Sequence, residues 1–165
     1  MAKIERFPGG NVINLTASVG ENSVNLKDDV MVVQALIKHA PEKRGVFGKV
    51  KLPEPDGIMT LQWIAIIKDY QRYLRQKKNE RVSVDGKINR AIGEKVFGKR
   101  ATWTILCLNA ELLEVRLLNG GADNEFKDLC RRFPQLEKVL EIPVGSLDLT
   151  LEGGSGVGSL DLGLE

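Results

Sequence analysis

The chain offers few of the side chains that enzymes use most often for catalysis. His39 is its only histidine, and Cys107 and Cys130 are its only cysteines. One histidine does not identify a Ser-His-Asp or Cys-His constellation, and neither glycine-rich phosphate-binding motif occurs. A metal site is not expected, because the chain has no Cys-x-x-Cys pair to join the one histidine. We therefore expect no catalytic residues, no metal, no cofactor and no enzymatic activity.

The histidine and the cysteines have simpler structural interpretations. His39 lies near the expected end of a helix, where we predict a solvated or capping side chain. Cys107 and Cys130 each recur in step with apolar neighbours, so we predict that both are buried and reduced. A disulfide between them is the alternative.

Two Asp-Gly pairs, Asp56-Gly57 and Asp85-Gly86, have the composition of tight turns. The Asp side chain accepts hydrogen bonds from the local backbone, and Gly adopts a positive φ without steric cost. We expect both turns to lead directly into helices, with the ring of Tyr70 buried between them. The neighbouring Gln71 can bond the backbone of a loop.

Helical periodicity predicts the elements that position these residues. We expect helices from about Asn25, whose side chain would cap the first turn, to Pro41, and then over 58–76, 88–97, 102–118 and 123–141, the last interrupted at Pro134. The 102–118 helix has two apolar seams, which predicts a place in the centre of the fold. Residues 1–24 are expected to form an extended arm or edge strand, and 41–57 a loop with a short hairpin. The apolar face of 58–76, including Trp63 and Tyr70, is expected to be core.

The same residues resemble a known family over 18–98. The stretch Asp29-Val30, Val33-Gln34 and Leu36, followed by Asp56-Gly57, Tyr70-Gln71 and Asp85-Gly86, is similar in type and spacing to peptidoglycan-binding-like domains. At one place the chain departs from the family, with Met59-Thr60-Leu61-Gln62-Trp63 where members usually carry Phe-Gly-Pro-x-Thr.

The composition predicts a mainly α fold with a minor β component, and this resemblance specifies its type: a small helical bundle, here with extra C-terminal helices and a short β tail. It divides the chain into an arm (1–17), a peptidoglycan-binding-like domain (18–100), added helices (101–142) and a repeated tail (143–165). It also implies that six residues around the two turns are candidates for ligand binding: Asp56, Gly57, Tyr70, Gln71, Asp85 and Gly86.

Two functions of different classes follow as hypotheses. One is a non-catalytic binding module for peptidoglycan or a related cell-wall glycan. The other is a protein–protein adaptor or structural subunit, recruited from the same fold. Domains of this type also accompany bacterial cell-wall enzymes, phage lysis proteins and contractile secretion systems, so a bacterial secretion or injection assembly is the setting that the resemblance implies for the adaptor.

The tail contains an internal repeat. Residues 144–152 and 157–165 are identical at eight of nine positions and are separated by Gly153-Gly-Ser-Gly156. Alternating leucines give each copy one apolar face if it is extended, so each copy is predicted to be a short strand. Four of these leucines are candidate docking residues for a partner or for self-association: Leu147, Leu149, Leu160 and Leu162. A hairpin on its own domain and an artificial linker-joined duplication are the alternatives.

Charge and hydropathy exclude other classes of partner. The net charge is +2, but residues 143–165 carry −4, which leaves +6 on the remainder. That excess is too small and too dispersed to indicate a nucleic-acid surface, and the basic run from Arg72 to Arg81 is expected to be a solvated helix end. The sequence has no apolar run long enough for a membrane span or a secretory signal. We expect a protein that is cytoplasmic as synthesised, or exported by a route that needs no cleavable signal.

Overall fold

The structure is a computed structural model that describes residues 1–7, 10–92, 103–118 and 124–141. Its fold is mainly α-helical, as predicted, with two small sheets. The elements in chain order are β1 (Ala2–Phe7), β2 (Gly10–Asn14), β3 (Val19–Gly20), α1 (Lys27–His39), α2 (Leu61–Lys77), β4 (Lys87–Ile88), α3 (Thr104–Leu118), α4 (Glu125–Arg132), a 3-10 helix (Pro134–Lys138) and β5 (Leu140–Glu141). The predicted strands of the tail lie outside the described residues.

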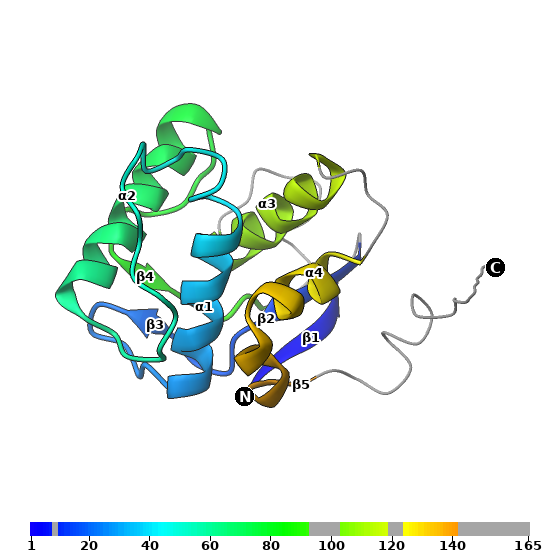
Figure 1. The fold of residues 1–165 in the computed structure, drawn as a ribbon. Helices are drawn as coiled ribbons and strands as arrows, with labels where there is room; N and C mark the ends of the chain where they lie inside the picture. The colour runs from blue at the N-terminus through cyan, green and yellow to red at the C-terminus, as the bar shows by residue number, and fades with distance from the viewer. Residues whose placement is uncertain (8–9, 93–102, 119–123, 142–165) are drawn as a thin grey trace.

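Helix α1 occupies the centre of the molecule (Figure 1), and most of its side chains are buried. Five apolar residues at helical spacing around this helix are fully inaccessible: Val30, Val33, Leu36, Ile37 and Ala40. The predicted cap at Asn25 is wrong, because Asn25 has a φ of 57° and its amide bonds Gly20 and Ser23 instead. The N-cap residue is Leu26, which makes no side-chain capping bond. Two acidic side chains in the first turn, Asp28 and Asp29, still favour the positive end of the helix.

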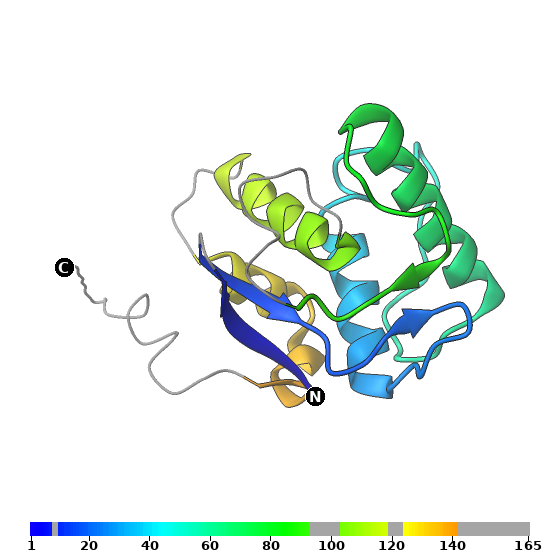
Figure 2. The same cartoon turned by 180° about the vertical axis from the view of Figure 1, so that it is seen from behind.

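The N-terminal stretch forms a hairpin within the core. Strand β1 pairs antiparallel with β2 and parallel with β5, so the sheet order is β2-β1-β5. Figure 2 shows the hairpin from behind, and β2 packs against α3. Ala2 and Ile13 are fully buried, so this stretch contributes residues to the hydrophobic core and also forms an edge strand.

The second sheet joins two distant turns of the chain. Strand β3 pairs antiparallel with β4, with Val19 opposite Ile88 and Gly20 opposite Lys87. The helix predicted from Ile88 is therefore wrong at its start, since Ile88 is in a strand and 89–92 have no regular structure. Its remaining part, 93–97, lies outside the described residues. The hairpin predicted within 41–57 is also wrong, because that stretch contains turns and no strand.

Helix α2 follows the prediction closely. It begins at Leu61, and the side chain of Thr60 accepts a hydrogen bond from the backbone N–H of Trp63. Trp63 and Tyr70 are buried, as expected for core residues. The C-terminal segment is interrupted at Pro134, where α4 gives way to the 3-10 helix. Among the described helices, none has both the length and the apolar composition that crossing a bilayer requires.

Helix α3 buries only one of its two apolar seams. The seam of Ile105, Leu108, Leu112 and Val115 is at most 3% exposed. The opposite seam becomes progressively more open toward the C-terminus, with Leu106 8%, Leu113 40% and Leu117 60% exposed. The predicted central position is therefore wrong for α3. Because α1 occupies the centre, α3 lies beside it with one apolar face unburied.

Candidate functional site

The first Asp-Gly turn is held by a glutamine of the central helix. The side-chain oxygen of Gln34 accepts hydrogen bonds from the backbone N–H groups of Asp56 (2.9 Å) and Gly57 (2.8 Å). The amide nitrogen of Gln34 donates to the carbonyl of Ile58 (2.9 Å) and to Oδ1 of Asp56 (3.3 Å). Asp56 Oδ1 also accepts from the N–H of Ile58. One buried amide therefore satisfies three consecutive residues of the turn, which leads into α2 as predicted.

The second Asp-Gly turn repeats this arrangement on α2. Gln71 Oε1 accepts from the N–H groups of Asp85 (3.1 Å) and Gly86 (2.9 Å), and Gln71 Nε2 donates to the carbonyl of Lys87 (2.9 Å). Gln71 Nε2 also lies 3.3 Å from Oδ1 of Asp85 and 3.2 Å from Oγ1 of Thr104. This turn leads into strand β4 and not into a helix, which corrects the prediction.

Both turns need glycine at their second position. Gly57 has a φ of 79° and Gly86 a φ of 72°, a region that side chains other than glycine rarely adopt. A third glycine, Gly20 of β3, lies directly on the second turn with a φ of 115°. A Cβ at Gly20 would lie 2.0 Å from the carbonyl oxygen of Gly86. The second turn is therefore fixed from two sides, by Gln71 and by the backbone of β3.

A small polar hollow opens beside the second turn. It measures about 80 Å³ and is lined by Gln71, Ser83, Asp85, Lys87, Asn89, Trp103 and Thr104. Asp85 and Asn89 are exposed, while Trp103 is partly buried at the start of α3. Oδ1 of Asp85 accepts from the N–H of Lys87, whereas its second oxygen accepts no hydrogen bond from any described residue. The hollow thus combines amide, hydroxyl, carboxylate and ammonium groups with one indole.

Tyr70 is not available to a ligand. It is fully buried, as predicted, and its ring stacks on Tyr73 with centroids 6.1 Å apart. Its hydroxyl is buried and makes no hydrogen bond with any described residue. Burial raises the pKa of Tyr70 well above its usual value and also raises the pKa of Glu111. Tyr70 therefore contributes to the core between α2 and α3.

His39 differs from its predicted state. It is 6% exposed, and its Nδ1 atom has no hydrogen-bond partner among the described residues. Burial, together with the positive charges of Arg132 and Lys43, lowers the pKa of His39 from 6.5 to about 4. The prediction of a solvated or capping histidine is therefore wrong, because α4 and its Arg132 cover this end of α1; the guanidinium of Arg132 donates to the carbonyl of Lys38 (3.0 Å).

The two cysteines are free thiols with different surroundings. Cys107 is buried, as predicted, whereas Cys130 is only partly buried. Burial raises the pKa of Cys107 to about 12 and raises that of Cys130. In the described parts of the chain, no three His, Cys, Asp or Glu side chains lie close enough together to hold a metal ion.

The structure separates the six candidate residues into different roles. Gln71 and Asp85 line the hollow, and Gly86 is its buried turn glycine, whereas Asp56 and Gly57 form the other turn and Tyr70 is core. Sequence reasoning did not identify Trp103 or Asn89 as candidate site residues. It also did not pair Gln34 with the first turn, although Gln34 and Gln71 each follow an apolar residue inside a helix, and that shared position was the available signal.

Comparison of the chain with models of known protein families, with curated proteins and with solved structures finds no match.

Proposed function

We propose that this protein is a non-catalytic binding module for peptidoglycan or a related cell-wall glycan, and that the hollow beside the second Asp-Gly turn receives the ligand. One observation supports this most: the hollow combines hydrogen-bonding side chains with the partly exposed indole of Trp103. Sugar recognition uses the same combination, because ring hydroxyls need polar partners and the apolar face of a sugar packs on an aromatic ring.

The size of the hollow restricts what can enter it. A volume of about 80 Å³ holds roughly two to three water molecules, which is enough for an acetamido or hydroxymethyl group and too little for a whole sugar ring. We infer that one substituent of an N-acetylated amino sugar enters the hollow while the ring lies against Trp103. The second oxygen of Asp85 and the amide of Asn89 are placed to bond that substituent.

The fixed geometry of the second turn supports recognition. Gln71 is 1% exposed and bonds both the turn backbone and Thr104, which also lines the hollow. Polar groups held in place by buried partners lose little entropy when a ligand binds. The first turn has the same backbone bonds, but Asp56 does not line this hollow, which makes the first turn an internal control.

Sedimentation with insoluble peptidoglycan sacculi tests the proposal. We expect the full chain to sediment with sacculi, and Trp103→Ala to weaken the affinity at least tenfold through loss of the stacking surface. Asp85→Asn keeps the Oδ1 acceptor of the turn but removes the charge, and it should weaken binding about threefold or more.

The matched control is Asp56→Asn, the same change in the equivalent turn, which should leave sedimentation unchanged. Circular dichroism would verify that each variant melts within a few degrees of the parent. Absence of the parent chain from the sacculus pellet would contradict the proposal, as would equal losses for Asp56→Asn and Asp85→Asn.

A further inference from the structure

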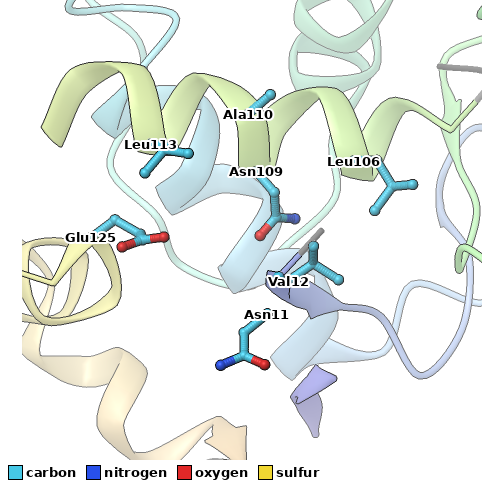
Figure 3. Close-up of a pocket in the computed structure, with 8 residues that line it drawn as sticks. Asn11, Val12, Leu106, Asn109, Ala110, Leu113 and Glu125 are labelled. Carbon is cyan, nitrogen blue, oxygen red and sulfur yellow. The ribbon is translucent and has the colours of Figure 1, made fainter. Parts of the chain in front are cut away.

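The unburied seam of α3 forms one wall of a groove at the edge of the sheet. Figure 3 shows Leu106, Asn109 and Leu113 on the side of α3 that faces Val12 of β2, with Glu125 of α4 at one end; Asn11 and Ala110 also line the hollow. The hollow between these walls measures about 190 Å³. An apolar cavity of about 150 Å³ accommodates a group as large as benzene, so this hollow has room for a leucine side chain.

The other wall offers backbone hydrogen bonds. Strand β2 is an edge of the sheet, and its Ile13 turns both backbone groups away from β1: the N–H donates to Asn109 Oδ1 (2.7 Å) and the carbonyl accepts from Asn109 Nδ2 (2.9 Å). Backbone groups alternate in direction along a strand, so Asn11 turns its own N–H and carbonyl the same way. Neither group of Asn11 is bonded within the described part of the chain. The groove therefore presents one unpaired donor and one unpaired acceptor beside an apolar seam.

We propose that the second copy of the tail repeat, residues 157–165 of the same chain, lies in this groove as an added edge strand. Its backbone would pair with Asn11, and the face formed by Leu160, Leu162 and Leu164 would cover the open seam of α3. This proposal is independent of the glycan site, because the two hollows share no lining residue.

The spacing of the leucines along an extended tail strand matches the spacing of the apolar residues along α3. Leucines on one face of an extended strand recur every 6.6 to 6.8 Å, which is about two residues at a rise of 3.3 to 3.4 Å. On α3, Leu106 to Ala110 and Leu113 to Leu117 are each four residues apart, which corresponds to about 6 Å along the helix axis. Leucines of the strand can therefore lie beside successive residues of the seam.

The length of chain between β5 and each copy of the repeat distinguishes the second copy from the first. Strand β5 ends at Glu141 on the opposite side of β1 from β2, so about 10 Å separates β5 from β2 across the sheet. A strand added outside β2 would lie three strand spacings, about 14 Å, from β5, whereas the three Cα steps from Glu141 to the start of the first copy at Val144 span at most about 11 Å. The second copy begins after fifteen residues, which can span roughly 50 Å. Only the second copy can reach the outer edge of β2 along its whole length.

A second protein molecule is a weaker candidate for this groove. A stable interface needs about 800 Å² from each partner, and the open seam has few large exposed side chains: Leu113, Leu117 and, at its margin, Leu118. One extended segment of nine residues is of the right size to cover such a narrow surface.

Residue-resolved hydrogen exchange on the full chain tests the proposal at the amide of Asn11. We expect exchange at Asn11 to be at least tenfold slower in the parent than in the double variant Leu160→Asp/Leu162→Asp. The matched control, Leu147→Asp/Leu149→Asp in the first copy, should retain the slow exchange. On the groove side, Leu113→Asp should make exchange at the Asn11 amide fast. Leu118→Asp, at a 73% exposed position beside the seam, should leave that exchange slow.

Three results would overturn the proposal. Equal exchange at Asn11 in the parent and in the Leu160/Leu162 variant would show that the groove is empty of the tail. Fast exchange at Asn11 in the Leu147/Leu149 variant alone would show that the first copy occupies the groove. Protection that grows with protein concentration would show that the tail of another molecule occupies the groove.

Discussion

Gln34 and Gln71 hold two different Asp-Gly turns with the same set of hydrogen bonds. Each uses its side-chain oxygen to accept from the Asp and Gly N–H groups, and its nitrogen to donate to the carbonyl of the following residue. The chain between helix and turn differs in length, with 22 residues from Gln34 to Asp56 and 14 from Gln71 to Asp85. The two glutamines therefore form the same hydrogen-bonded motif, although the chain between helix and turn differs in length.

Replacing either glutamine by alanine should destabilise the fold. Gln34→Ala and Gln71→Ala each leave two turn N–H groups without an acceptor, and we expect a loss of about 2 to 3 kcal/mol in the free energy of unfolding. Urea unfolding followed by circular dichroism measures this loss. The control Gln76→Ala, at an exposed position of α2, should change stability by less than about 0.5 kcal/mol. Equal effects at all three positions would contradict the role assigned to the buried pair.

Gly20→Ala should be among the most damaging single substitutions. The new methyl group would meet the Gly86 carbonyl oxygen at 2.0 Å while the backbone holds a φ of 115°, so strain and overpacking together should cost about 3 kcal/mol or more. The control is Gly45→Ala, which has a φ of 81° with no atom within 4 Å of the new Cβ and should cost about 1 to 2 kcal/mol. Thermal melts of both variants would compare them. A smaller loss for Gly20→Ala than for Gly45→Ala would contradict the close approach of β3 to the turn.

The pKa of His39 should make the fold sensitive to acid. Because the folded pKa is about 4 and the unfolded value is 6.5, the unfolded chain binds a proton first as the pH falls. The stability that neutral His39 contributes is complete above pH 6.5 and is lost progressively between pH 6.5 and pH 4, by an amount of the order of 3 kcal/mol.

Titration by proton NMR can follow this residue directly, since the chain has one histidine. We expect its ring signals to remain those of the neutral form down to about pH 5. His39→Leu should remove most of the loss in stability over this range. A midpoint near 6.5 in the folded protein would contradict the buried environment.

The two thiols should react with a thiol reagent one after the other, Cys130 before Cys107. Cys130 is partly buried, whereas Cys107 is 3% exposed and its pKa is about 12, so a thiol reagent at pH 8 should modify Cys130 first and Cys107 only as the protein unfolds. Cys130→Ser should remove the early phase of modification and leave the late one. Loss of both thiols in denaturant without a reductant would show instead that they form a disulfide.

The sequence by itself determined the features that depend on local periodicity and local turn chemistry. The period of apolar residues predicts α2, α3 and the break at Pro134 because a helix repeats every 3.6 residues whatever surrounds it. The Asp-Gly pairs predict tight turns because a positive φ and a nearby acceptor are properties of those residues alone. The burial of Trp63 and Tyr70 follows from the same periodicity.

Only the tertiary structure decided which partners these elements meet. Both seams of α3 are apolar in sequence, and only one of them is buried along its whole length in the fold, where α3 contacts α1 and β2. His39 is enclosed by Arg132 and its helix, which lie 93 residues further along the chain. Asn25 bonds Gly20 and not the start of α1, and Ile88 pairs with Val19 in a strand. Each of these outcomes depends on contacts between residues distant in sequence, where local preferences are weaker than the free energy of burying apolar surface and pairing backbone groups.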